Sequence, residues 1–177
     1  IEAKVIDSNK NFILDRGKPG ELCIKGYSVM KEYWKNKTET KKAIDKDGWM
    51  RTGDLVLMRD DGYLEIVGRI KDTIIRGGEN IYPREVEEFL IKIDQIEQAY
   101  VFGVPDESYG EIVGCWVKLE KNKIISEKEI KTKCKNKIAS FKIPSFFRIV
   151  DEFPMTASGK VQKFKMSEKE IALKMNK

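Results

Sequence analysis

Two dense apolar runs in the second half of the chain constrain its fold more than any other feature. The segments QAYVFGV (98–104) and EIVGCWVKL (111–119) are rich in β-branched and aromatic residues. Such runs are typical of strands that are buried within a sheet. The segment PSFFRIV (144–150) predicts a further strand. The second half of the chain is therefore expected to contain a buried sheet.

Amphipathic helices are expected next to these strands. Pro83 begins a predicted helix whose apolar positions share one face, namely Val86, Phe89, Leu90 and Ile93. A capping box of Ser126 and Glu129 predicts a second helix that runs to about Ile138. Ser167 with Glu170 is expected to cap a short final helix by the same pattern.

The order of these elements predicts an α+β fold with helices packed on a small sheet. Residues 1–68 are expected to be mostly β, because alternating strands are separated by turns and two Asp-Gly pairs bracket the strand that begins a hairpin. Residues 27–44 could hold one or two short helices. A boundary between a small mostly-β N-terminal piece and the α+β part is predicted near residues 68–72.

Composition excludes several kinds of chemistry. The chain has no histidine, so catalytic triads and imidazole acid/base catalysis are excluded. The 34 Lys and Arg and 29 Asp and Glu give a net charge of +5, and both signs are mixed along the sequence, so no nucleic-acid partner is expected. Basic residues concentrate over 128–137 and 160–165. A polyanionic small ligand or a solvated face would explain them, and a solvated face is favoured for the first cluster.

The three cysteines, Cys23, Cys115 and Cys134, are far apart and odd in number, which predicts neither a disulfide framework nor a metal site. Reduced thiols of this kind are typical of a cytoplasmic protein. Neither a transmembrane run nor a secretory leader is recognisable. The sequence starts inside an apolar alternation without an initiator methionine, so a fragment of a longer protein is expected.

Three short motifs indicate chemistry when they are taken together. They are RTGD (51–54), GRIKDTIIRGGENIYPREVE (68–87) and PMTASGK (154–160). Each alone is compatible with a turn residue, a tight turn or a solvent-exposed lysine. In this order the three resemble the acyl-adenylate-forming superfamily over essentially the whole chain, and most closely its fatty-acyl-CoA synthetase branch.

The resemblance implies roles for three residues near the predicted boundary. Asp54 would bind both hydroxyls of the ATP ribose, and Arg69 would also reach the nucleotide. Lys71 would be the hinge about which the C-terminal domain turns between two half-reactions. An exposed salt-bridge partner is the other interpretation of Lys71.

The resemblance also implies a CoA site in the second half. Gly77 and Gly78 would line the tunnel for the pantetheine arm, because glycine permits close approach. Tyr109 and Phe141 would hold the CoA nucleotide, with Lys142 available to its phosphates. Packing in the core is an equally compatible interpretation of Phe141.

Lys160 is implied to be the catalytic residue. In the superfamily the corresponding lysine acts in the first half-reaction, where it bridges the acyl carboxylate and the ATP phosphate. A loop would let it be withdrawn afterwards.

The predicted organisation is the last β subdomain of a large N-terminal domain (1–68), a hinge (69–72) and a mobile C-terminal lid (73–177). The cofactors implied are ATP, CoA and Mg²⁺, and the Mg²⁺ site and the phosphate loop are expected in a missing N-terminal domain of the same chain. The fragment alone is expected to be inactive. An adenylation domain that loads a carrier protein, or a non-catalytic module that binds CoA or nucleotide, are the alternatives.

Overall fold

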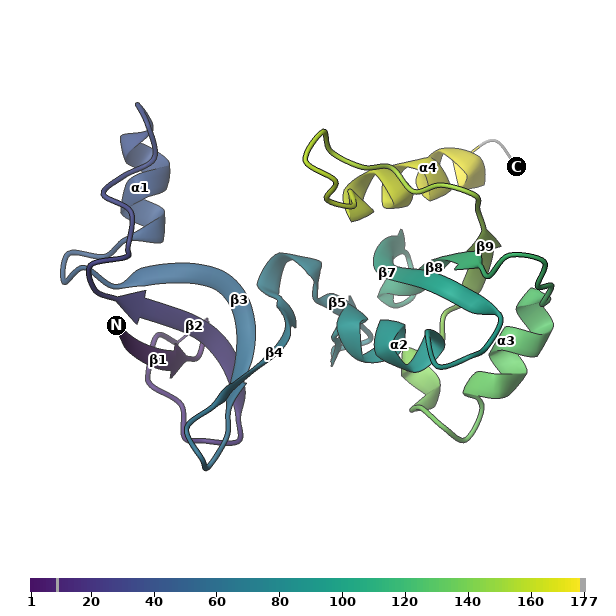
Figure 1. Cartoon of the computed structure of the whole chain (residues 1–177), viewed down its shortest axis with the longest axis horizontal. Coiled ribbons are helices and arrows are strands. Elements are labelled where there is room, and N and C mark those ends of the chain that lie inside the picture. Colours follow the sequence, from purple (N-terminus) through teal and green to yellow (C-terminus); the bar gives the residue numbers. More distant parts are fainter. Residues whose placement is uncertain (9, 176–177) are drawn as a thin grey trace. The chain divides into compact units, whose positions relative to one another are not determined.

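The computed structural model describes residues 1–8 and 10–175. The chain divides into two compact units, Ile1–Lys71 and Asp72–Lys177, and each has its own sheet (Figure 1). The division falls inside the segment 69–72 that the sequence analysis assigned to a hinge, and the short 3-10 turn Ile70–Asp72 spans it. The roles predicted for the segments 1–68, 69–72 and 73–177 stay predictions.

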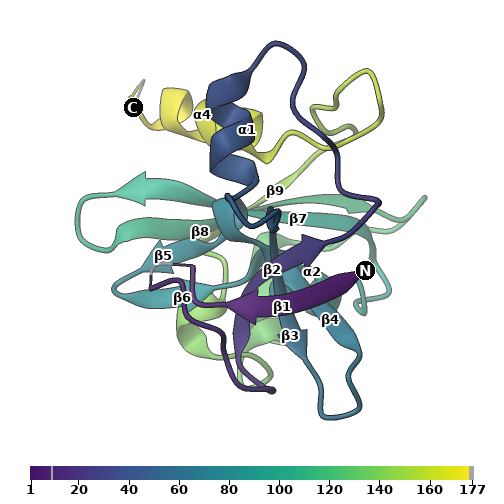
Figure 2. The ribbon, with the colours of Figure 1, turned by 90° about the vertical axis from the view of Figure 1, so that its left-hand side faces the viewer.

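The first unit is a four-stranded antiparallel sheet in chain order (Figure 2). Its strands are β1 (Glu2–Ile6), β2 (Pro19–Lys25), β3 (Met50–Met58) and β4 (Leu64–Arg69). One helix, α1 (Lys37–Ala43), lies in the segment where one or two were expected. It begins where the side chain of Asn36 accepts a hydrogen bond from the Glu39 N–H at 3.1 Å, which satisfies a donor at the helix start.

The second unit combines a five-stranded sheet with three α-helices. The strands are β5 (Ile74–Arg76), β6 (Glu79–Ile81), β7 (Ile96–Asp106), β8 (Gly110–Leu119) and β9 (Phe146–Ile149). Their order is β6-β5-β8-β7, and β9 pairs with β8 in parallel while all other pairs are antiparallel. The helices are α2 (Pro83–Leu90), α3 (Glu127–Cys134) and α4 (Lys163–Met175). The predicted α+β class, with helices on a small sheet, is confirmed.

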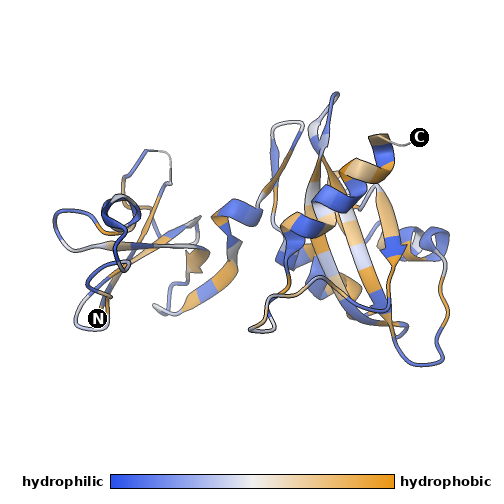
Figure 3. Cartoon of the chain, turned by 90° about the horizontal axis from the view of Figure 1, so that it is seen from above, coloured by the Kyte–Doolittle hydropathy of each residue, from blue (hydrophilic) through white to orange (hydrophobic). Residues whose placement is uncertain are grey.

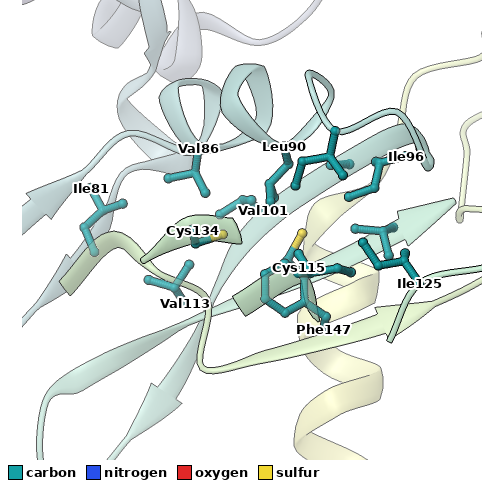
Figure 4. Packing of buried hydrophobic residues seen from close by; sticks show 14 of the residues in the cluster. Ile81, Val86, Leu90, Ile96, Val101, Val113, Cys115, Ile125, Cys134 and Phe147 are labelled. Atoms are coloured by element: carbon teal, nitrogen blue, oxygen red, sulfur yellow. The ribbon is translucent and has the colours of Figure 1, made fainter. Parts of the chain in front are cut away.

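Helices cover both faces of this sheet. Neighbouring residues of a strand point to opposite sides, and here the residues on both sides are apolar, so each face has to be shielded from water. Val101 of β7 and Cys115 of β8 pack in a core with Val86 and Leu90 of α2, as Figure 4 shows. The next residues along, such as Phe102 and Trp116, form a second core on the side of α4. In Figure 3 the strands of this sheet are mostly coloured as hydrophobic or neutral. Each large side chain that is fully buried in this way contributes about 1.5–3 kcal/mol to folding.

Two predicted helix boundaries are wrong. The helix α3 ends at Cys134 rather than near Ile138, because Asn136 adopts a left-handed backbone with φ of 60°. Ile138 still packs against the core, which explains why its spacing suggested a helix. The final helix begins at Lys163, so Ser167 and Glu170 lie inside it and do not form a cap.

The two side chains that were predicted to cap the final helix instead form hydrogen bonds to the sheet. The Ser167 hydroxyl donates to the Gly103 carbonyl oxygen at 2.7 Å. Glu170 is buried and accepts hydrogen bonds from Trp116 Nε1 at 2.7 Å and from the Arg148 guanidinium. These bonds anchor α4 to the sheet.

None of the helices in the described part of the chain is long and apolar enough to cross a lipid bilayer.

Candidate functional site

Asp54 and Arg69, both predicted to bind the nucleotide, are opposite each other on neighbouring strands. They form a register pair of β3 and β4, and Arg69 Nε lies 3.1 Å from Asp54 Oδ1. Both side chains are partly exposed, so the pair is expected to stabilise the fold by less than about 1 kcal/mol. A partly exposed carboxylate beside a fixed cation can still accept hydrogen bonds from a vicinal diol.

A bulge in β3 presents Asp54 at this place. Gly53 has φ of 72°, a left-handed value that favours glycine, and the pairing of β2 with β3 shifts register here. Thr52 fixes the bulge, since its hydroxyl donates to the Leu22 carbonyl oxygen at 2.9 Å and accepts from the Asp54 N–H at 3.1 Å. The Thr-Gly-Asp order therefore has a local structural reason.

A cavity of about 520 Å³ lies beside this bulge within the first unit. Its volume is in the range of small-molecule sites. The lining residues are Ser8, Glu21, Arg51, Thr52, Gly53, Arg69, Ile70 and Lys71. Two of the predicted site residues, Arg69 and Lys71, thus line one cavity together with Gly53, which precedes Asp54 in the sequence. No ion pair of Lys71 is present among the described residues, so the salt-bridge interpretation of Lys71 has no support in this unit.

Sequence reasoning missed an ion pair in the wall of this cavity, between a buried glutamate and a partly exposed arginine. Glu21 is 5% exposed, and Arg51 Nη1 lies 3.3 Å from its carboxylate. A buried carboxylate is costly unless it is paired, which Arg51 provides. The only signal in the sequence was a glutamate at an inward position of the strand GELCIK.

Gly77 and Gly78 form the two-residue turn between β5 and β6. Their φ values are 57° and 88°, and a pair of left-handed residues is the favoured turn of a two-residue hairpin. The Gly77 N–H donates to the Tyr109 carbonyl oxygen at 2.9 Å. Both glycines are exposed, so their backbone is open to a slender ligand, as the predicted pantetheine tunnel requires.

Tyr109 and Phe141, predicted to hold the CoA nucleotide, both contact a residue that the sequence analysis did not assign. Arg76 places its guanidinium carbon 4.8 Å from the centre of the Tyr109 ring. Its Nη1 donates to the Phe141 carbonyl oxygen at 2.9 Å. The Phe141 ring packs against the hydrophobic core, which supports a structural role for that side chain, whereas the Tyr109 ring is half-exposed.

Lys142 is paired rather than open to solvent. Its Nζ lies 2.6 and 2.7 Å from the two carboxylate oxygens of Glu85 on α2. A phosphate would have to compete with this carboxylate for the ammonium group. The prediction that Lys142 serves the CoA phosphates stays a prediction.

Lys160 lies at an exposed, well-defined turn. The Thr156 N–H donates to the Lys160 carbonyl oxygen at 2.8 Å, and the Lys160 N–H donates to Thr156 Oγ1 at 3.0 Å. Gly159 supplies the left-handed conformation, with φ of 77°, that closes the turn. Among the described residues, none forms an ion pair with Lys160. The turn therefore presents an uncompensated ammonium group.

Thiol and metal chemistry find no support at these sites. All three cysteines are free and buried, and burial raises the pKa of Cys134 to about 11 and that of Cys115 well above its ordinary value. Thiols of this kind stay protonated at neutral pH and are poor nucleophiles. Within residues 1–8 and 10–175, no three carboxylate or thiol side chains are grouped so that they could hold a metal ion.

Comparisons with known proteins agree with the predicted family. Residues 85–160 match the family described as AMP-binding enzyme C-terminal domain. A putative acyl-CoA synthetase of Bacillus subtilis, YngI, is 51% identical over 97% of this chain and 31% of its own length. The mitochondrial medium-chain acyl-CoA ligase ACSF2 of Rattus norvegicus is 45% identical over 94% of this chain and 27% of its own length.

A solved structure extends the likeness to three dimensions. The crystal structure of ATP-bound MatB from Rhodopseudomonas palustris matches with a TM-score of 0.90 and 35% identity, over 95% of this chain and 33% of that one. The chain therefore spans about a third of the length of the relatives it matches. The chain belongs to the acyl-adenylate-forming superfamily and corresponds to the C-terminal portion of its members.

Proposed function

We propose that the full-length protein containing this chain is an AMP-forming acyl-CoA synthetase. It would join a fatty or other carboxylic acid to ATP, giving acyl-AMP and pyrophosphate, and then transfer the acyl group to CoA, releasing AMP. The names of the bacterial and rat relatives support this reaction class. Medium-chain fatty acids are the first substrates to test, because the rat relative is a medium-chain ligase.

The observation that carries the proposal is the exposed Lys160 on its hydrogen-bonded turn. When a carboxylate attacks the α-phosphorus of ATP, two negatively charged groups are brought together, and negative charge builds on the α-phosphate oxygens and on the leaving pyrophosphate. An ammonium group that is not already paired can offset this charge, and a fixed turn reduces the cost of placing it. Because the turn is internally bonded through Thr156, Lys160 would be brought in or withdrawn by movement of the turn as a whole.

The first unit would contribute nucleotide binding. Asp54 would accept hydrogen bonds from the ribose hydroxyls, and Arg69 would hold that carboxylate and reach the nucleotide. Lys71, at the end of the same cavity wall, would be the hinge. The Mg²⁺ ion that would screen the ATP phosphates is proposed to bind in another part of the full-length protein, since the described residues offer no carboxylate cluster for it.

The second unit would contribute the CoA site. The Gly77-Gly78 turn would accommodate the pantetheine arm, and the half-exposed Tyr109 ring would stack on the base. The 177-residue chain alone is proposed to be inactive, because its sequence shows no glycine-rich phosphate loop. The cytoplasmic location predicted from the cysteines stays a prediction.

The test compares the two half-reactions in the full-length protein. We expect Lys160→Ala to lower ATP–pyrophosphate exchange with a medium-chain acid by a factor of about 10²–10³, as for other lost transition-state contacts. Thioester formation from supplied acyl-AMP should be largely spared, because in acyl-AMP the attack of the carboxylate on the α-phosphorus is already complete. Lys165→Ala is the matched control, since Lys165 is also exposed and lies five residues further on. An equal loss in both half-reactions would reject the role of Lys160.

A further inference from the structure

Arg76 joins two separate segments at the CoA site of the second unit. It is the last residue of β5, directly before the Gly77-Gly78 turn, and it pairs with Gly110 at the start of β8. Its guanidinium lies over the Tyr109 ring, 4.8 Å from the centre, and also donates to the Phe141 carbonyl oxygen at 2.9 Å. A planar cation with forked donors can lie over the ring and donate to the carbonyl oxygen at the same time.

Stability alone does not explain this arginine. Its Nε–H is buried and has no acceptor among the described residues. A buried donor without an acceptor costs about 1–3 kcal/mol, so the site carries an energetic penalty. An unsatisfied buried group of this kind calls for a reason other than packing, and functional sites are where such local costs are tolerated.

We propose that Arg76 is a positioning residue for the CoA nucleotide, because it fixes the Tyr109 ring relative to the Phe141 backbone. We name the Tyr109 ring and the Phe141–Lys142 backbone the CoA ledge. The inference rests on the proposed function. It adds a residue that acts through Tyr109 and Phe141 and does not itself contact CoA.

The geometry supports this indirect role. One face of the Tyr109 ring meets the guanidinium, yet the residue is 51% exposed, so much of the ring is open for stacking. A half-exposed ring without a partner would lose rotamer freedom when the base binds. Holding the ring beforehand removes part of that cost. The Nε–H is buried, Nη1 donates to the Phe141 carbonyl oxygen and the guanidinium lies over the Tyr109 ring, which argues against a direct contact with phosphate.

The test measures KM and kcat of the full-length protein with CoA and with pantetheine, which carries the same thiol but no nucleotide. For Arg76→Met we expect the KM for CoA to rise about tenfold, in line with a cation–π contact together with a hydrogen bond. The kcat at saturating CoA and the KM for pantetheine should change by less than about threefold, because the CoA ledge would contact only the nucleotide part of CoA. Arg76→Lys should raise the KM for CoA by less than Arg76→Met does, since a cation remains over the ring.

Arg84→Met is the matched control. Arg84 is an exposed arginine on α2 whose ion pair is with Glu88, and its loss should leave both KM values unchanged. A melting temperature close to that of the wild type would show that the variants fold. If Arg76→Met does not fold, the KM for CoA of Arg76→Lys is measured in its place.

Two results would overturn the inference while leaving the proposed function intact. One is an unchanged KM for CoA in Arg76→Met, and the other is an equal rise for CoA and pantetheine, which would indicate a general loss of shape. Absence of any thioester formation by the wild type would instead remove the proposed function itself, and the inference with it.

Discussion

The two units differ in how completely they bury their own sheets. In the second unit, α2 and α3 cover one face and α4 the other, with a hydrophobic core on each side. In the first unit, the buried hydrophobic side chains of the described residues are Val5, Ile6, Cys23, Leu55 and Val56. Its aromatic residues Tyr27, Trp34 and Tyr63 are 93%, 82% and 73% exposed.

The difference bears on the proposed mechanism. A unit with a closed core on both faces can turn as one body, because its packing resists internal deformation. The unit that carries Lys160 and the Gly77-Gly78 turn has this property. The unit with Asp54 and Arg69 has fewer buried hydrophobic side chains among the described residues, so it offers less internal packing to resist deformation.

The strongest test of this comparison acts where the two units divide. Lys71→Pro in the full-length protein should leave ATP–pyrophosphate exchange measurable but reduce acyl transfer to CoA by about a thousandfold, or about 4 kcal/mol. Proline fixes φ near −65°, a value typical of the 3-10 turn Ile70–Asp72, and so should prevent the backbone from turning.

Lys71→Ala is the control for that substitution. It removes the ammonium group but keeps the backbone free, so acyl transfer should continue. Unchanged acyl transfer in Lys71→Pro would reject Lys71 as the hinge and would mean that the units need not move independently about this residue.

A smaller effect is expected from truncating one buried isoleucine at an equivalent position in each unit. Ile81 and Ile6 are both buried at the ends of the outermost strands β6 and β1. Ile81→Ala should reduce the free energy of unfolding of its unit by about 3 kcal/mol, because close-packed neighbours keep the cavity open. Ile6→Ala should cost its unit about half as much, since its sparser surroundings can relax.

Hydrogen exchange of the slowest amides in each unit would measure these two losses separately. Equal losses would contradict the difference in packing that distinguishes the units. Exchange confined to the mutated unit would support their independence.

The smallest effect concerns the anchor of α4 and depends on pH. Burial raises the pKa of Glu170, but hydrogen bonds from Arg148 and Trp116 lower it by more, so the pKa lies below its ordinary value. A carboxylate with a lowered pKa stabilises the fold above its unfolded pKa, about 4.3, and this stabilisation is lost as the pH falls through the folded pKa. Glu170→Gln should therefore cost about 1.5 kcal/mol at pH 7 and less in acid.

Urea unfolding of the wild type and Glu170→Gln between pH 7 and pH 3 would measure this change. Glu168→Gln, at an exposed position of the same helix, should match the wild type throughout. A difference between the wild type and Glu170→Gln that stays constant over this range would contradict the contribution of the charged carboxylate.

Local patterns predicted most of the elements. The strands over 98–104 and 111–119 form β7 and β8, the helix from Pro83 forms α2, and the Ser126 capping box begins α3. These features depend on the spacing of apolar residues and on turn chemistry within a few positions. The strand β6 was missed because only three residues separate the glycine turn from the residue before Pro83.

The sequence by itself determined the strand and helix types, the family and the residues of its motifs, since these are written in short, ordered segments. The tertiary structure alone decided which partners those residues have. Ser167 and Glu170 have the pattern of a cap but bind Gly103, Trp116 and Arg148. Lys142 has the pattern of a free lysine but pairs with Glu85, and Arg76 meets Tyr109 and Phe141 only in the folded sheet. Such contacts join segments far apart in the chain, and their energies depend on burial and geometry that a local pattern does not contain.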